Sequence, residues 1–150
     1  MTLAEDDAAV IPALMRAARG AYSAAIAAEL HADGIDDLPR NGPFVLGGMA
    51  NHGGSLGDLI RELRVSKQAA SQLIDTLVLR GFLERHVDAA DRRRLAVELT
   101  PRGHAAAAAV RRGVEAVDAE LARRIAPEEL SGLRAGLTAL ADIAGDAARV

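Results

Sequence analysis

The residues most able to do chemistry in this sequence are polar and basic side chains that form two groups. The first group is Ser66, Lys67, Gln68, Ser71 and Gln72. The second group is Arg92, Arg93 and Arg94, with Asp91 directly before them. Amide and hydroxyl groups can read base edges in the major groove of DNA, a lysine can meet a phosphate, and guanidinium groups suit a narrow minor groove. Together the two groups predict contact with DNA, provided that the fold holds them side by side.

A helix between Ser66 and Gly81 must carry the first group. Apolar residues recur there at helical spacing and form one stripe, while the polar group and Asp75 share the opposite face. The stripe consists of Ala70, Leu73, Ile74, Leu77 and Val78. Ser66 is a typical helix start, and Gly81 is a typical stop. A shorter helix is predicted before it, from Ser55 to Leu63, and a tight turn connects the two helices.

A β-hairpin must carry the arginines. The segments FLERHV and LAVELT each alternate apolar and polar residues at period two, as expected of two short strands. The connection from Asp88 to Arg94 is longer and more charged than a minimal turn requires. It should therefore project into solvent as a wing.

Helices are predicted on both sides of this central region. A long helix covers about 7–30, the loop 31–42 follows, and a short helix starts near Pro43. Thr100 as N-cap and Pro101 open a helix that reaches about Ile125, and Pro127 opens a last one. The apolar seam of the last helix is Leu130, Leu133, Leu137, Leu140 and Ala141. The predicted fold is mainly α with a small β-hairpin, a single domain over 1–150 with a winged helix-turn-helix over about 43–100.

Charge and composition narrow the function. The net charge is -3, but the segment 61–104 holds nine Lys or Arg against six acids, so the acidity lies outside the candidate contact region. The absence of cysteine excludes disulfides, thiolate metal sites and thiol redox chemistry within the chain. The acidic N-terminus is unlike a signal peptide, and no apolar run approaches the roughly 20 residues of a membrane span. We therefore expect a soluble, cytoplasmic protein with no membrane partner.

The segment from Val65 to Gly103 resembles the recognition helix and wing of the multiple antibiotic resistance regulator (MarR) family. The matching residues follow that family's D-P-x-D-R-R wing and its L-T-x-x-G continuation at the same spacing. They are Asp88, Asp91, Arg92, Arg93, Leu99, Thr100 and Gly103. The order of the flanking helices also fits, so the resemblance extends over nearly the whole chain.

The resemblance implies a homodimer joined by N- and C-terminal helices, over about 7–30 and 101–149. It implies binding to a pseudo-palindromic operator in double-stranded DNA, usually as a repressor released by a small phenolic or other aromatic effector. It also implies that Asp91 holds Arg93 by an ion pair, which keeps the shape of the wing, and that Arg93 reaches the minor groove.

The sequence departs from the family pattern at three places. Arg64 stands where the family usually has Gly in the turn, and Ile60 where it often has Ala on the preceding helix. A non-glycine residue at such a turn predicts backbone strain or a slight displacement. Ala89 replaces the usual Pro of the wing, which leaves the loop less restricted but keeps its charges.

The remaining candidate residues concern a ligand pocket and a metal. By resemblance, an effector pocket would be lined by Tyr22, Phe44, Met49 and His52, although core packing is the favoured role of each apolar member, because a chain so poor in aromatic residues uses them to fill space. The four histidines are His31, His52, His86 and His104. They show no metal-ligand spacing, so no metal and no cofactor are expected.

Two other function classes fit the sequence less well than a DNA-binding regulator does. A winged helix used to dock a protein without DNA would keep this fold, but it would not need three arginines on the wing. An enzyme lacks support, because the sequence has no phosphate loop, no G-x-S-x-G motif and no cysteine nucleophile.

Overall fold

The computed structural model describes residues 10–52, 55–93 and 95–147. The chain divides into two compact units, Met1–Val114 and Glu115–Val150. The prediction of a single domain over 1–150 stays a prediction.

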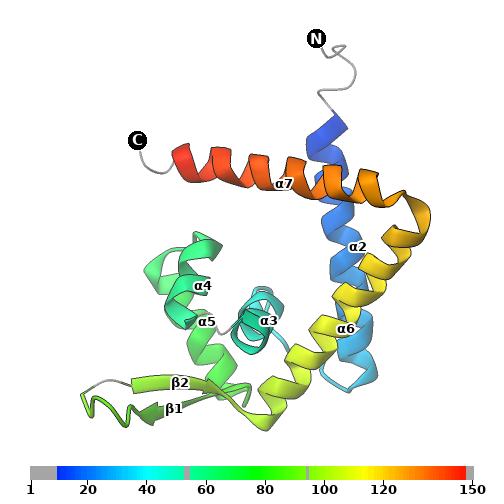
Figure 1. Cartoon of the computed structure of the whole chain (residues 1–150). Coiled ribbons are helices and arrows are strands. Elements are labelled where there is room, and N and C mark those ends of the chain that lie inside the picture. Colours follow the sequence, from blue (N-terminus) through cyan, green and yellow to red (C-terminus); the bar gives the residue numbers. More distant parts are fainter. Residues whose placement is uncertain (1–9, 53–54, 94, 148–150) are drawn as a thin grey trace. The chain divides into compact units, whose positions relative to one another are not determined.

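The predicted fold class is confirmed, because helices dominate and two strands form an antiparallel hairpin (Figure 1). The elements are α2 (Val10–Ala32), α3 (Gly42–His52), α4 (Leu56–Leu63), α5 (Lys67–Leu79), β1 (Leu83–Val87), β2 (Leu95–Leu99), α6 (Pro101–Arg124) and α7 (Pro127–Ala147). Along the chain, α4, α5 and the hairpin give the order of a winged helix-turn-helix. None of the described helices combines the length and apolar character that crossing a membrane requires.

The core of the first unit lies where α3, α5 and the hairpin meet. Its largest fully buried side chains are Phe82, Leu46, Leu77, Leu83 and Val45. Burying each large apolar side chain stabilises the fold by about 1.5–3 kcal/mol. The packing of this cluster therefore holds α5 against the hairpin. Three of the five come from the segment Leu77–Leu83, which joins these two elements.

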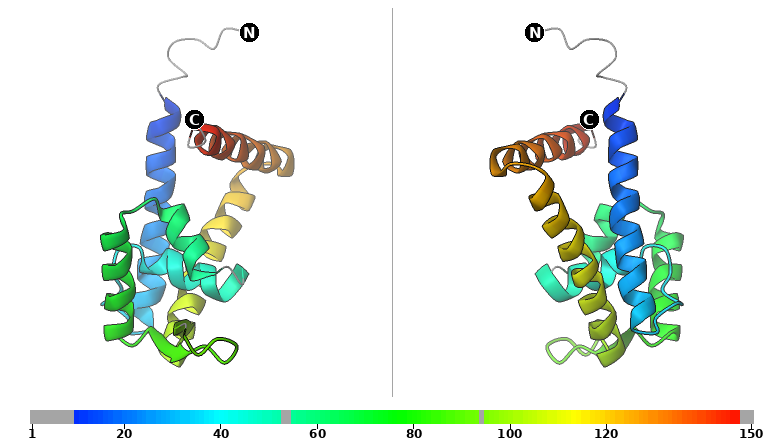
Figure 2. Two further views of the ribbon diagram at one scale, coloured as in Figure 1. Left: turned by 90° about the vertical axis from the view of Figure 1, so that its left-hand side faces the viewer. Right: turned by 90° about the vertical axis from the view of Figure 1, so that its right-hand side faces the viewer.

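Helices α2 and α6 pack closely within the first unit. A Cβ atom on Gly113 would lie 2.7 Å from the Cα atom of Ile26, so only glycine permits this approach. The residue directly before Gly113, Arg112, binds Glu29 at 2.8 Å and Asp33 at 2.7 Å. These hydrogen bonds to the two carboxylates raise the pKa of Arg112. Figure 2 shows α2 and the first half of α6 from two sides.

The turn between α4 and α5 contains the strain that the sequence predicts. Arg64 has φ 52° and ψ 36°, the left-handed conformation that side chains with a Cβ disfavour. Within the described residues it is the one non-glycine position with positive φ. Its N–H donates to the carbonyl of Arg61 at 3.1 Å, which ends α4 and redirects the chain into α5. The sharp turn is therefore made without the glycine that would favour it.

Two substitutions at Arg64 separate backbone strain from loss of the side chain. Arg64→Gly and Arg64→Ala both remove the guanidinium, but only glycine adopts the left-handed conformation without a steric penalty. The glycine variant should therefore exceed the alanine variant in free energy of unfolding by about 1 kcal/mol. Urea denaturation measures the difference, and an alanine variant of equal or greater stability would contradict the strain at this turn.

Candidate nucleic-acid interface

Helix α5 begins at a serine cap, as the sequence predicts. Ser66 has an extended backbone, φ -63° and ψ 158°, and its Oγ accepts a hydrogen bond from the N–H of Ala69 at 3.1 Å. Its carbonyl accepts from the N–H of Ala70 at 2.9 Å. The cap satisfies one of the N–H groups that a helix start leaves without a partner. It also fixes the end of the helix that carries the candidate base-reading residues.

The two faces of α5 separate as predicted. Ala70, Leu73 and Leu77 are buried, while Ile74 and Val78 are half-buried. The opposite face is exposed, and its members are Ser66, Lys67, Gln68, Ser71, Gln72 and Asp75. These side chains are therefore accessible to a partner along the first three turns of the helix.

The last turn of α5 is closed by backbone hydrogen bonds around Gly81. Gly81 has φ 77°, its N–H donates to the carbonyl of Val78 at 3.0 Å, and the N–H of Phe82 donates to the carbonyl of Leu77 at 2.9 Å. This pair of bonds is the Schellman motif, which uses carbonyls that the helix end leaves without partners. The predicted stop at Gly81 is thus part of a fixed passage from helix to strand.

An ion pair links the polar face of α5 to the hairpin. Asp75 of α5 accepts a hydrogen bond from Arg85 of β1. The Asp75 side chain is 64 % exposed and that of Arg85 is 38 % exposed, so water screens the pair and it contributes little to stability. Sequence reasoning missed this contact, because a helix-to-strand pair ten residues apart has no characteristic spacing.

The wing loop is shaped by two aspartates. Asp88 Oδ1 accepts from the N–H of Ala90 at 2.9 Å, and Asp91 Oδ1 accepts from the N–H of Arg93 at 3.0 Å. Such side-chain bonds to the backbone two residues on stabilise turns. Asp91 therefore contacts Arg93 through its backbone, whereas the predicted side-chain ion pair stays a prediction. Arg92 and Arg93 are exposed, and Arg94 lies outside the described residues.

The base of the hairpin explains the L-T-x-x-G pattern. Thr100 caps α6 as predicted, because its Oγ1 accepts from the N–H of Gly103 at 3.0 Å and donates to the carbonyl of Gly81. The N–H of Thr100 donates to the carbonyl of Phe82 at 3.1 Å. A Cβ atom on Gly103 would collide with that same carbonyl oxygen, so the position requires glycine.

Arg102 adds a polar brace at this junction. Its guanidinium lies 4.1 Å from the centre of the Phe82 ring, donates to the carbonyl of Arg80 and binds Asp37 at 2.8 Å. The hydrogen bond from Arg102 lowers the pKa of Asp37. The loop before α3 is thereby tied to the ends of both α5 and the hairpin.

The residues predicted to line an effector pocket are spread between core and surface. Tyr22 is half-buried on α2, Phe44 of α3 is 42 % exposed, and Met49 packs against the core. The side chain of His52 lies outside the described residues. The pocket stays a prediction.

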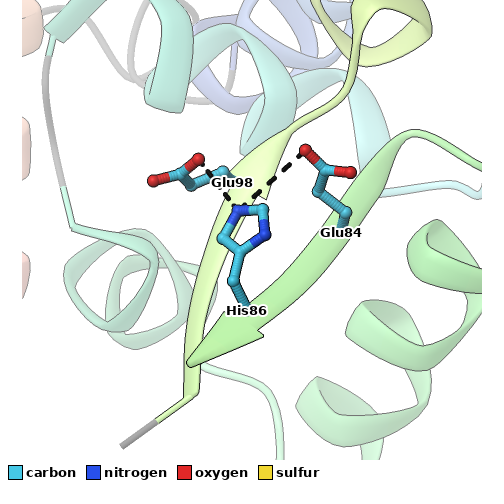
Figure 3. Close-up of side chains that lie close together, drawn as sticks. All are labelled: Glu84, His86 and Glu98. Carbon is cyan, nitrogen blue, oxygen red and sulfur yellow. Dashed lines mark hydrogen bonds and ion pairs between the residues drawn. The ribbon is translucent and has the colours of Figure 1, made fainter. Parts of the chain in front are cut away.

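A further polar cluster on the hairpin was not predicted. Glu84 and His86 of β1 and Glu98 of β2 gather on one face of the sheet (Figure 3). His86 Nε2 lies 2.9 Å from Glu98 Oε2 and 4.0 Å from Glu84 Oε1. The strand alternation that placed Leu83 and Arg85 on one face also places Glu84 and His86 together on the other, so the signal was available once the register was known.

Comparison with known proteins supports the resemblance. Residues 36–94 match the model of the MarR family, and no curated protein matches the sequence. Among solved structures, the MarR family transcription regulator SP03579 has a TM-score of 0.71 at 21% identity, covering 96% of this chain and 91% of that one. RV1404 from Mycobacterium tuberculosis has a TM-score of 0.66 at 27% identity, with coverage of 95% and 97%. MepR from S. aureus in complex with DNA has a TM-score of 0.67 at 22% identity, with coverage of 87% and 96%.

The cap of α5 can be tested by a pair of serine substitutions. Ser66→Ala removes the acceptor for the Ala69 N–H and should lower the free energy of unfolding by about 1 kcal/mol. Ser71→Ala is the matched control, because Ser71 lies on the exposed face in the body of the same helix, and it should change stability by less than about 0.5 kcal/mol. Urea titrations compare the variants with the parent protein, and equal stability of both would show that the cap does not hold the helix start.

Proposed function

We propose that this chain is a transcription regulator that binds a pseudo-palindromic DNA operator as a homodimer, and the match of residues 36–94 to the MarR family model supports this. It acts as a repressor, and a small aromatic or phenolic effector releases it from DNA. The observation that carries the proposal is the exposed polar face of α5, held beside an arginine-bearing wing by the junction around Phe82.

Helix α5 supplies the sequence-reading surface. Gln68, Ser71 and Gln72 offer short hydrogen-bonding groups that match the donors and acceptors of base edges in a major groove. Ser66 and Lys67 lie at the capped start of the helix, where the backbone N–H groups and the lysine suit phosphate oxygens. In this arrangement the phosphate contacts of Ser66 and Lys67 fix the position of the helix along the DNA, and the amides of Gln68 and Gln72 read the base sequence.

The wing supplies a second contact. Arg92 and Arg93 belong to the loop that Asp88 and Asp91 shape, and Arg94 follows them in the sequence. Guanidinium groups are favoured in the narrow, electronegative minor groove of A·T-rich DNA. In Figure 1 the hairpin extends away from the core of the first unit, which leaves its loop accessible to such a groove.

Exposed apolar side chains on two helices support dimerisation. The exposed fraction of each side chain is between 41 and 66 %, which is far more than apolar residues show on the packed face of a helix. On α2 they are Ile11, Leu14 and Met15, and on α7 they are Leu133, Leu137, Leu140 and Ile143. A second copy of the chain would cover both surfaces. The two copies of α5 would then meet successive major grooves, about 34–36 Å apart along one face of the duplex.

The effector proposal rests on fewer observations. MepR, one of the similar structures, is also known bound to ethidium bromide, an aromatic cation. In this chain Tyr22, Phe44, Met49 and His52 are the residues proposed to line an effector site.

Binding to DNA is tested by fluorescence anisotropy with the duplex upstream of the chain's own gene. A specific complex should form with a stoichiometry of two chains per operator, weaken as salt is raised, and dissociate when the effector is added. Candidate aromatic acids are titrated at fixed salt. Binding that is equally strong to unrelated duplexes would overturn the proposal of a sequence-specific regulator.

The wing contact predicts the effect of removing one guanidinium. Arg93→Ala should weaken operator binding by about 1–3 kcal/mol, because one specific contact is lost, while the free energy of unfolding stays unchanged. Arg134→Ala, which removes an exposed arginine of α7, is the control and should keep the parent affinity. Unchanged affinity of the Arg93 variant at equal stability would refute the role of the wing.

The reading helix predicts a different kind of effect. Gln68→Ala or Gln72→Ala should change which bases are preferred more than it changes affinity for non-specific DNA, because amides contact base edges rather than phosphates. Competition among operator variants with single base-pair changes measures the preference. A uniform loss over all sequences would instead assign these side chains to the DNA backbone.

A further inference from the structure

We propose that Glu84, His86 and Glu98 form a binding site for a divalent transition-metal cation, with Zn²⁺ as the best-fitting ion. This proposal departs from the expectation drawn from histidine spacing along the sequence. It is independent of the proposed function, because it concerns a site on the hairpin that binds its ion with or without DNA.

The register of the hairpin creates the site. Glu84 of β1 is paired directly with Glu98 of β2, so their side chains leave the same face of the sheet. His86 stands two residues after Glu84 and therefore shares that face. The ladder of β1 and β2 fixes the three Cα positions, and strands hold ligands more firmly than loops do.

The distances suit a small cation. One ligand atom from each side chain lies within 4.8 Å of the other two, and His86 Nε2 lies 2.9 Å from Glu98 Oε2 and 4.0 Å from Glu84 Oε1 (Figure 3). Bond lengths of 2.0–2.2 Å around tetrahedral zinc require ligand atoms about 3.4 Å apart. Glu98 would have to move slightly away from His86 and Glu84 slightly closer, which rotations about exposed side-chain bonds provide.

The charges favour a cation as well. Two carboxylates directly opposite each other across a pair of strands repel, and this cost remains unless a positive group lies between them. A divalent ion placed between Glu84 and Glu98 cancels both charges and takes the place of the contacts that His86 makes with the two carboxylates. Water completes the coordination, because the three side chains are 38 to 66 % exposed.

The ligand set indicates which ion should bind. An imidazole nitrogen with two carboxylates suits zinc, whereas magnesium prefers oxygen ligands alone and loses its water reluctantly. The site should therefore bind Zn²⁺ more tightly than Mn²⁺, and Mn²⁺ more tightly than Mg²⁺.

Isothermal titration calorimetry of the full chain, stripped of metal with a chelator, tests the site. One Zn²⁺ per chain should bind saturably. His86→Ala should weaken binding by about 100-fold, at or beyond the upper end of the 10–100-fold loss known for residues that merely support a ligand. The matched control is His31→Ala, because His31 also contacts a carboxylate, Asp36 at 2.7 Å, but has one acidic partner instead of two. This control should bind zinc like the parent.

Two conservative variants keep the test decisive if His86→Ala fails to fold. Glu84→Gln and Glu98→Gln preserve the shape of the hairpin, and each should weaken zinc binding by at least tenfold, while Glu62→Gln on α4 should not. A histidine side-chain NMR spectrum should show the ring-nitrogen signals of His86 shifting with one equivalent of Zn²⁺. The site is refuted if zinc shows no saturable binding, if Mg²⁺ binds as tightly as Zn²⁺, or if the three variants bind zinc like the parent.

Discussion

Both backbone polar groups of the buried Phe82 are hydrogen-bonded, and through them three elements are joined at one residue. Its N–H donates to Leu77 at 2.9 Å and ends α5, while its carbonyl accepts from Thr100 at 3.1 Å where the hairpin meets α6. Gly103 passes so close to this carbonyl that no Cβ fits. Because an unpaired buried backbone group costs about 1–3 kcal/mol, these bonds resist separate movement of the helix end, the hairpin base and the start of α6. Arg102 covers the aromatic ring and extends the junction to Asp37.

This junction lets other side chains serve recognition. A helix of 13 residues such as α5 is marginal in water by itself, so its geometry comes from its cap, its closed last turn and its buried stripe. Ser66 caps the helix, Gly81 ends it and the apolar face packs against the core. The exposed amides of Gln68 and Gln72 take part in none of these structural contacts. The Asp75–Arg85 pair connects the helix to the strand but adds little stability, because it is open to solvent. A helix face that packing does not need is one that selection can fit to a sequence of bases.

Prediction from the sequence succeeded where a structural feature depends on a few neighbouring residues. The caps at Ser66 and Thr100 and the stop at Gly81 are of this kind, because each needs only a side chain or a backbone angle within three residues of a helix end. It failed where the feature depends on how elements are placed. The pairing of Asp75 with Arg85 needs the angle between helix and strand, and the cluster at His86 needs the register of a hairpin. The helix predicted to begin at Pro127 is present as α7, but the leucines of its apolar seam are exposed, so periodicity identifies an apolar face without identifying what covers it.

The same distinction applies to charge. A net charge of -3 argues against binding to nucleic acid only if acidic and basic side chains are evenly distributed over the surface. On the hairpin they are not evenly distributed. The carboxylates of Asp88 and Asp91 are directed at backbone N–H groups of the loop, where they order the wing. Glu84 and Glu98 lie on the two strands and not in the wing loop. Interactions between exposed charges are screened beyond about 8–10 Å. The repulsion between these glutamates and a DNA phosphate at the wing tip therefore depends on their distance from the tip more than on their number. A cation bound between these two glutamates would neutralise the acidic side chains of the two strands. The electrostatic potential around the hairpin therefore depends on which charges lie next to one another there, and not on the net charge of the whole chain.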